Sequence, residues 1–384
     1  MVELVNKNAF HSATPTRWLV PPLVLNGRFL TQPVTGVQRV ARALLAEFDT
    51  LAADGCLVPP RVVVPARAKL VDPPDLRCLK IIRAGVLTGH AWEQIELPRI
   101  AGGDTLLCLG NTAPAARLKR GAHPTLVMVH DLSYRYMPDA YSRKFRLFYN
   151  AVVPVALRHS THLITVSKAE KVAIQRQYPG TSRHPSFHAL QNGGAGQALP
   201  RGAQTSRAPL GLYVGSLSKR KNAHGVLRIA TTLLRAHPNA QFHIIGGTAA
   251  SLQAMALDVP SDVAARIKCL GQINDPAQIA AAYSTARFLL FPSYYEASPL
   301  PPIEAMDHGC PVLCSDIPSL RERCADAALY YAPDDHDAFV KTASQLLTDE
   351  TFRAQRAALG QAHAKRFTWR TQAHALLRIL EQPQ

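Results

Sequence analysis

Short apolar runs alternate with stretches of helical periodicity along the first half of the chain. One such stretch begins at Gly36 and places Val40, Leu44 and Phe48 at helical spacing, and a second helix-rich stretch covers residues 138–159. The apolar runs read as buried strands, at residues 23–30, 61–65, 104–110, 125–129 and 161–166. Strands that alternate with helices predict a parallel sheet with crossover helices.

The second half repeats this alternation after a break. Residues 191–209 are rich in Gly and Pro and have few periodic apolar positions, so we place an inter-domain linker at residues 201–209. Further strands are expected near 210–215, 241–246, 267–270, 287–291 and 311–315. The predicted organisation is an α/β domain over residues 1–200 with residues 1–17 loosely ordered, a second α/β domain over 210–366, and a terminal amphipathic helix within 367–384.

Composition narrows the class of protein. The 384 residues carry a formal net charge of +16, which favours an anionic partner. The chain has no aromatic–basic nucleic-acid motif, so no nucleic acid is expected. The run Trp18–Leu30 is broken by Asn26 and Arg28 and reads as an opening strand, not a signal peptide. Seven cysteines without a Cys-x-x-Cys pair favour reduced thiols in a cytoplasmic protein and argue against structural zinc.

Two carboxylates bracket a strand-to-helix turn in the second domain. Glu296 follows the apolar run at 286–292, and Pro301-Pro302 suits the first turn of a helix that carries Glu304. Free N–H groups at such a turn attract phosphate, and neighbouring carboxylates accept hydrogen bonds from hydroxyls. The arrangement predicts a nucleotide-sugar pocket.

The motif around this Glu pair resembles that of a known enzyme family. Glu-x7-Glu followed by Ala-Met and Gly-Cys-Pro-Val resembles the signature of the retaining family 4 glycosyltransferases, which have the GT-B fold. The resemblance implies two Rossmann-like domains facing across a cleft, with the C-terminal helix crossing back to the first. It implies that Glu304 holds the ribose and Glu296 a hydroxyl of the transferred sugar. Where the family has Gly-Phe-Gly, this chain has Ala-Ser-Pro; Pro299 has no N–H for phosphate, whereas Leu300 has one.

A basic run supplies the charge that a leaving diphosphate needs. A strand ends at Gly215-Ser216, where donor contacts are expected, and Lys219-Arg220-Lys221 follows. Ligands gather at the carboxyl ends of strands, and developing negative charge requires a metal ion or fixed cations. By resemblance, Arg220 and Lys221 grip the donor diphosphate.

Residues of the first domain are expected on the opposite side of the cleft from the Glu pair. The segment that begins with His130 and Asp131 resembles the family's His-Asp-Leu-Ser-Phe, which implies that His130 approaches the donor sugar. Gly36 starts a helix where backbone can approach the diphosphate, and Arg39 of the same helix adds positive charge there. Further donor contacts are expected at Gly246, Gln272 and Ile273.

No metal site is predicted. Asp335-His336-Asp337 has the Asp-x-Asp form of metal-dependent transferases but reads as a solvated loop. The basic segment from Arg143 to Arg158 is partly amphipathic; it either packs on the sheet or lies on anionic lipid at the inner membrane face.

The sequence therefore predicts a retaining, metal-independent hexosyltransferase of bacterial surface polysaccharide (lipopolysaccharide) biosynthesis. No cofactor is expected. The donor is a nucleotide-diphosphate sugar, with GDP-mannose favoured over UDP sugars, and the acceptor is a glycan or a lipid-linked molecule. Two other classes stay open at this stage: a glycoside hydrolase that uses the Glu pair, and a basic nucleic-acid-binding α/β protein.

Overall fold

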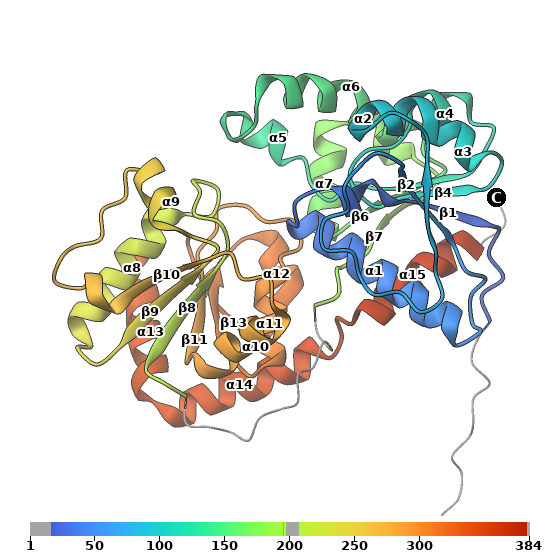
Figure 1. The fold of residues 1–384 in the computed structure, drawn as a ribbon. Helices are drawn as coiled ribbons and strands as arrows, with labels where there is room; N and C mark the ends of the chain where they lie inside the picture. Colours follow the sequence, from blue (N-terminus) through green and yellow to red (C-terminus); the bar gives the residue numbers. More distant parts are fainter. Residues whose placement is uncertain (1–16, 195, 197–206, 382–384) are drawn as a thin grey trace, which may run out of the picture.

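The computed structural model describes residues 17–194, 196 and 207–381, and these form two α/β domains side by side (Figure 1). The N-terminal domain holds a seven-stranded parallel sheet in the order β3-β2-β1-β4-β5-β6-β7. Its strands are β1 Leu23–Asn26, β2 Arg61–Pro65, β3 Ile81–Ala84, β4 Thr105–Cys108, β5 Thr125–Met128, β6 His162–Thr165 and β7 Phe187–Ala189.

The C-terminal domain holds a six-stranded parallel sheet in the order β10-β9-β8-β11-β12-β13. Its strands are β8 Leu210–Val214, β9 Gln241–Ile245, β10 Ile267–Gly271, β11 Phe288–Phe291, β12 Val312–Ser315 and β13 Ala328–Tyr331. The central strands β8, β11 and β12 are buried along their whole length, as expected for a parallel sheet covered on both faces.

Helices cover both sheets. The N-terminal domain contributes α1 Gly36–Ala53, α2 Gly89–Ala91, α3 Leu97–Ala101, α4 Ala115–Arg120, α5 Ser133–Tyr136, α6 Arg143–His159 and α7 Lys168–Gln177. The C-terminal domain contributes α8 Ala223–Ala236, α9 Ala249–Ala254, α10 Pro276–Thr285, α11 Pro301–Asp307, α12 Pro318–Cys324, α13 His336–Thr348 and α14 Glu350–Ala364, and α15 Trp369–Glu381 ends the described chain. Short 3-10 turns lie at Gly27–Thr31, Pro138–Ala140, Pro179–Arg183, Ala264–Arg266 and Ala325–Ala327, and a π-helical turn at Trp92–Glu96.

The predicted first strand is too long. β1 ends at Asn26, whose side chain accepts a hydrogen bond from the N–H of Arg28 at 3.2 Å and turns the chain into a 3-10 helix. Gly27 lies against β2, where an added Cβ would stand 2.7 Å from the carbonyl oxygen of Val63. The apolar residues after the turn, Phe29 and Leu30, are buried outside the strand, which is why the apolar run extends beyond it.

Three strands escaped the sequence analysis, and all lie at sheet edges. β3 is partly exposed at all four positions, and β7 has only three residues, so neither presents an apolar run. β13 has one buried residue, Ala328, followed by three partly exposed ones. Edge strands have one free side and a weaker apolar pattern, so periodicity alone does not find them.

The C-terminal helix returns to the N-terminal domain. In Figure 1, α15 lies along α1 in the first domain. Trp369, Leu376 and Leu380 of α15 belong to the same buried cluster as Leu44 and Phe48 of α1. The predicted GT-B crossover is therefore confirmed.

A buried arginine joins the chain segment after β7 to the second domain. Arg323 of α12 has no exposed surface, and its guanidinium donates to the carbonyls of Asn192, Gly193 and Pro299. These bonds fix the chain that leaves the first domain against the loop that precedes α11.

Part of the predicted organisation lies outside the described residues. This holds for residues 1–16 of the segment expected to be loosely ordered and for residues 201–206 of the expected linker.

Candidate functional site

The carboxyl ends of both sheets meet at a cleft of about 1030 Å³ between the domains. Every residue that the sequence analysis singled out for catalysis or donor binding lines this cleft: Gly36, His130, Gly215, Ser216, Arg220, Lys221, Gly246, Gln272, Ile273, Glu296, Leu300 and Glu304. Their roles stay predictions, but their convergence follows from the fold, since parallel strands end at one edge of each sheet.

Arg220 and Lys221 lie against Glu296. The Lys221 Nζ donates to Glu296 Oε1 at 2.8 Å, and Arg220 Nη1 donates to Glu296 Oε2 at 3.3 Å and to the Tyr295 carbonyl at 3.0 Å. The loop after β8 supplies the cations, and the loop after β11, the next strand in the sheet, supplies the carboxylate. Two cations thus share one carboxylate, which leaves net positive charge at this wall of the cleft.

Glu296 is held in its ionised form. It is only 8 % exposed, and burial opposes its ionisation, but the charges of Lys221 and Arg220 outweigh burial and lower its pKa. The carboxylate therefore acts as a hydrogen-bond acceptor near neutral pH, and its four lone-pair directions leave room for a hydroxyl besides the two cations.

Glu304 takes part in a second polar cluster that crosses the cleft. The Tyr283 hydroxyl of α10 donates to Glu304 Oε2 at 3.0 Å, and Arg39 from α1 of the other domain forms an ion pair with Glu304. Sequence analysis missed Tyr283, because a tyrosine in a helix looks like an ordinary core residue. Arg39 had been considered only as added charge near Gly36.

His130 follows β5 and is fixed as a particular tautomer. The ring Nε2 lies 2.9 Å from the Leu109 carbonyl oxygen, so Nε2 carries the hydrogen. The backbone N–H of His130 donates to Asn111 Oδ1 at 2.7 Å. Burial lowers its pKa, so the ring is neutral near pH 7. Nδ1 is then an acceptor for a hydroxyl.

Glycines allow the backbones of β8 and β9 to meet at the cleft. Gly246 has φ 91°, and a Cβ there would stand 2.7 Å from the carbonyl oxygen of Gly215. Gly36 begins the 18-residue helix α1, and a Cβ there would meet nothing within 4 Å, so the helix end opens into free space. Both features suit close approach of a phosphate-bearing ligand.

The remaining predicted donor contacts lie on two loops. Gln272 reaches across the cleft to the Val34 carbonyl at 3.4 Å, and Ile273 packs at the edge of the second domain's core. Leu300 precedes α11, and its backbone N–H has no acceptor among the described residues. The Pro299 carbonyl instead binds Arg323, at 3.2 Å from Nε, so this loop is anchored from behind.

Two further polar clusters lie in the first domain; the sequence analysis pointed to Asp131 in the first of them, but not to the partners of either. Asp131 Oδ1 accepts hydrogen bonds from the Ser133 N–H and hydroxyl, at 2.9 and 2.6 Å, and Ser133 in turn bonds the Tyr141 hydroxyl. Arg28 at the cleft is held by buried Glu93 at 3.2 Å. Burial opposes ionisation of Glu93, but Arg28 and neighbouring donors lower its pKa to about 2.

The Asp335-His336-Asp337 segment is a helix start and not the solvated loop that was expected. Asp335 caps α13 by accepting from the Ala338 N–H at 3.1 Å. Among the described residues, no group of three or more His, Cys, Asp and Glu side chains is placed to hold a metal ion. No helix within the described ranges is both long and apolar enough to cross a bilayer.

Solved structures share the fold over nearly the whole chain. Sucrose-phosphate synthase from Thermosynechococcus elongatus aligns with a TM-score of 0.69 at 19% identity, covering 92% of this chain and 96% of that chain. WaaG, a glycosyltransferase involved in lipopolysaccharide biosynthesis, aligns with a TM-score of 0.67 at 16% identity, covering 93% and 98%. The fold is GT-B, as predicted from the sequence.

Sequence comparison finds similarity to known glycosyltransferases. Residues 201–366 match the family model described as glycosyl transferases group 1. The O-antigen chain mannosyltransferase B of Escherichia coli is 35% identical over 164 residues, and the O-antigen chain mannosyltransferase RfbU of Salmonella typhimurium is 27% identical over 227 residues. These alignments cover 41% and 57% of this chain, and 42% and 61% of the relatives, so the chain spans about half the length of the curated relatives it matches.

Proposed function

We propose that the protein is a retaining glycosyltransferase that moves a sugar from a nucleotide-diphosphate donor to a glycan or lipid-linked acceptor. The observation that carries the proposal is the contact of Arg220 and Lys221 with Glu296 inside the inter-domain cleft. A nucleotide sugar needs cations for its diphosphate and acceptors for its hydroxyls, and this cluster offers both within hydrogen-bonding distance.

In the proposed reaction, the bond between the anomeric carbon and the diphosphate oxygen breaks as the acceptor hydroxyl attacks from the same face. Arg220 and Lys221 receive the negative charge that the departing diphosphate gains, and a diphosphate oxygen takes the acceptor proton. Glu296 and His130 Nδ1 accept hydrogen bonds from sugar hydroxyls, and Glu304 accepts those of the ribose. The chemical step then needs no bound ion, because fixed side chains stabilise the leaving group.

The ribose position requires a local rearrangement. Glu304 is engaged by Tyr283 and Arg39, so ribose hydroxyls have to share or replace the Arg39 contact. We infer that donor binding loosens the Arg39 ion pair across the cleft, while Tyr283 keeps Glu304 in position from its own domain.

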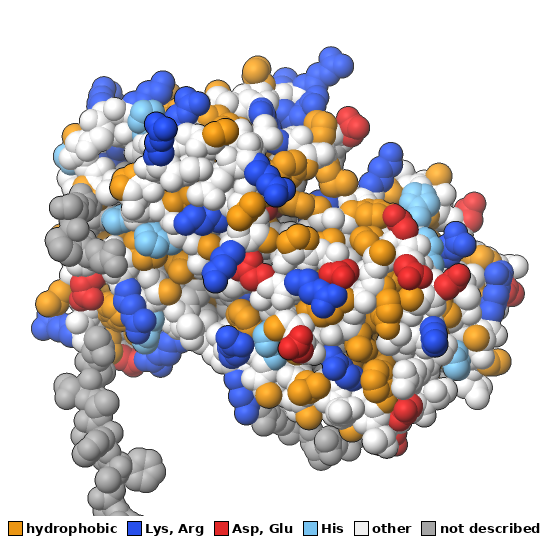
Figure 2. Space-filling model, turned by 180° about the vertical axis from the view of Figure 1, so that it is seen from behind, with side chains coloured by type: hydrophobic (Ala, Val, Ile, Leu, Met, Phe, Trp, Pro, Cys, Tyr) orange, Lys and Arg blue, Asp and Glu red, His pale blue; other side chains and the backbone are white. Residues whose placement is uncertain are grey.

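The state of Glu296 argues against the hydrolase alternative. A general acid needs a carboxyl that keeps its proton near neutral pH. Burial alone would raise the pKa of Glu296, but its two cationic partners lower it. The nucleic-acid alternative finds little support in the surface: Figure 2 shows Lys and Arg spread over both domains of the face it presents, without a single continuous basic stripe.

Mannose is the favoured sugar and GDP the favoured leaving group. Two relatives are named O-antigen chain mannosyltransferases, and a serotype-specific mannosyltransferase of Escherichia coli is 33% identical over 96 residues. We therefore place the protein in the assembly of a bacterial surface polysaccharide, with its acceptor a growing glycan.

Thermal stability against UDP, GDP, dTDP and ADP tests this proposal. A ligand at 100 times its Kd stabilises the folded protein by about 2.7 kcal/mol, so one nucleotide is expected to raise Tm clearly more than the others, with GDP favoured. Addition of the corresponding nucleotide sugar and a glycan acceptor is expected to release the nucleoside diphosphate. Release of sugar from a simple glycoside, with no nucleotide raising Tm, would contradict the proposal.

A further inference from the structure

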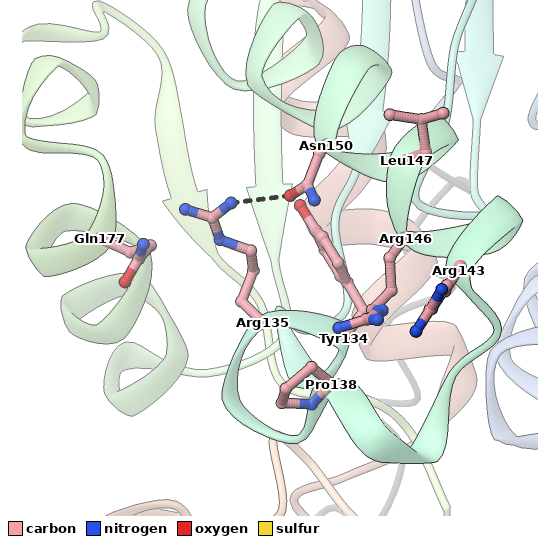
Figure 3. A pocket seen from close by; sticks show the side chains of 8 residues that line it. All are labelled: Tyr134, Arg135, Pro138, Arg143, Arg146, Leu147, Asn150 and Gln177. Atoms are coloured by element: carbon pink, nitrogen blue, oxygen red, sulfur yellow. Dashed lines mark hydrogen bonds between the residues drawn. The ribbon is translucent and has the colours of Figure 1, made fainter.

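A second cavity lies outside the donor cleft, on the other side of α6. It has a volume of about 500 Å³ and is lined by Tyr134, Arg135, Pro138, Arg143, Arg146, Leu147, Asn150 and Gln177. Figure 3 shows Arg135 coming from α5 and Arg143 and Arg146 from the first turns of α6. None of these lining residues is acidic, so three guanidinium groups share one opening without a carboxylate.

The three arginines are not neutralised by the described part of the protein. None of them forms an ion pair with a described residue; Arg135 donates to Asn150 Oδ1 at 2.7 Å and lies over the Tyr178 ring at 5.6 Å. The Nε of Arg146 is buried and has no hydrogen-bond partner among the described residues. The nearest carboxylate in the sequence, Asp139, is exposed and does not line the cavity.

Helix α6 adds to the positive potential. The helix is 17 residues long and starts at Arg143, so its N-terminal N–H groups and dipole point toward the same region. Each guanidinium group can donate two hydrogen bonds to one phosphate group, so a cluster of three suits a phosphate-bearing ligand.

An apolar side chain stands beside this charge. Leu147 is 75% exposed, the second-highest exposure among the described large hydrophobic residues, and Tyr136 of α5 is 40% exposed. Leucine in water next to arginines is the arrangement of a helix that lies at a bilayer interface, where the apolar group enters the acyl region and the cations meet phosphates.

The cavity and the donor cleft lie on opposite sides of helix α6. Tyr134 lines both, and the opposite face of α6 carries Phe145 and Tyr149 along the cleft wall, with Tyr141 just before the helix. A membrane lipid bound at the arginines would therefore hold the first domain's side of the cleft close to the membrane surface.

We propose that Arg135, Arg143 and Arg146 form a binding site for the phosphate of anionic membrane lipids, with Leu147 inserted beside it. The site deepens the proposed function, since it would hold the enzyme where a lipid-linked acceptor lies. It does not touch the donor-binding residues.

Sedimentation with vesicles tests the site. The full chain is mixed with vesicles of phosphatidylcholine alone, or of phosphatidylcholine containing phosphatidylglycerol, and the bound fraction is measured. Binding is expected only with phosphatidylglycerol and is expected to weaken with added salt. Each basic residue near an anionic surface contributes about fivefold in affinity, so Arg143→Ala/Arg146→Ala is expected to weaken binding about 25-fold.

The matched control is Arg228→Ala/Lys341→Ala, which removes the same charge from exposed positions on α8 and α13 of the other domain. It is expected to bind vesicles as the wild type does. Leu147→Asp, in contrast, is expected to bind vesicles more weakly than the wild type. Equal weakening by both double variants, or unchanged binding by Arg143→Ala/Arg146→Ala, would overturn the proposal, as would loss of oligonucleotide binding in that variant without loss of vesicle binding.

The nucleotide-dependent rise in Tm separates this proposal from the proposed function. Arg143→Ala/Arg146→Ala is expected to keep that rise, because neither residue lines the donor cleft. If the wild type does not bind vesicles but nucleotides still raise its Tm, the lipid site alone is refuted. If it binds vesicles but no nucleotide raises its Tm, the transferase assignment alone is refuted.

Discussion

Lys221→Ala is expected to lower kcat for sugar transfer by about 10²–10³-fold, the usual cost of removing one group that stabilises charge in a transition state. Lys221 donates to Glu296 at 2.8 Å and lines the cleft, so its removal takes away a leaving-group cation and leaves Glu296 with Arg220 alone. The reduction is expected in kcat as well as in kcat/KM, because the charge on the diphosphate develops during bond breaking. Steady-state kinetics with saturating nucleotide sugar measure it.

The chain supplies a neighbouring control. Lys219 has the same charge two residues earlier, is exposed, and does not line the cleft. Lys219→Ala is expected to keep kcat within about twofold, since exposed charges interact weakly. If both alanine variants lose activity equally, a general basic turn and not a specific cation would account for the effect.

Arg323→Met is expected to destabilise the protein by about 3 kcal/mol. The guanidinium is fully buried and donates to three backbone carbonyls: those of Asn192 and Gly193 in the segment that leaves the first domain, and that of Pro299 in the loop before α11. Burial lowers the pKa of Arg323 to about 10, so it stays charged at neutral pH. Methionine removes a costly buried charge but leaves carbonyls without donors, each of which costs about 1–3 kcal/mol. Chemical denaturation measures the loss.

Arg321→Met, two residues earlier on α12, is the matched variant. Arg321 pairs with Asp316 at 2.6 Å on the surface, where both side chains are about half exposed. Its removal is expected to change stability by less than about 1 kcal/mol. An Arg323→Met protein as stable as Arg321→Met would show that the carbonyls find other partners.

Much of the fold follows from local pattern. The apolar strands and the helices between them define two parallel sheets, and the Glu296–Glu304 motif marks the strand end where the inter-domain cleft lies. A glutamate pair at fixed spacing is local information, because the strand, turn and helix that place it are continuous in sequence. The basic run after β8 is local in the same way.

The contacts between domains could not be predicted. Arg39 and Glu304 are 265 residues apart, and although the motif marks Glu304, the pattern around Arg39 does not distinguish it from an ordinary surface charge. Arg323 is one of two arginines in α12, and of these two it alone is buried. Which charges meet across a cleft depends on how two rigid domains pack, and no periodicity in one strand or helix records that.

The central claim is that side-chain cations, without a metal ion, stabilise the leaving diphosphate. It is tested most directly by titrating wild type and Arg220→Ala/Lys221→Ala with the selected nucleoside diphosphate and with its nucleoside, in the presence of EDTA. Charge-assisted hydrogen bonds contribute about 1.5–3 kcal/mol each, so the wild type should bind the diphosphate at least about 100-fold more tightly than the nucleoside, and the double variant should lose most of that preference. A preference that EDTA abolishes in the wild type, or that survives in the double variant, would contradict the account.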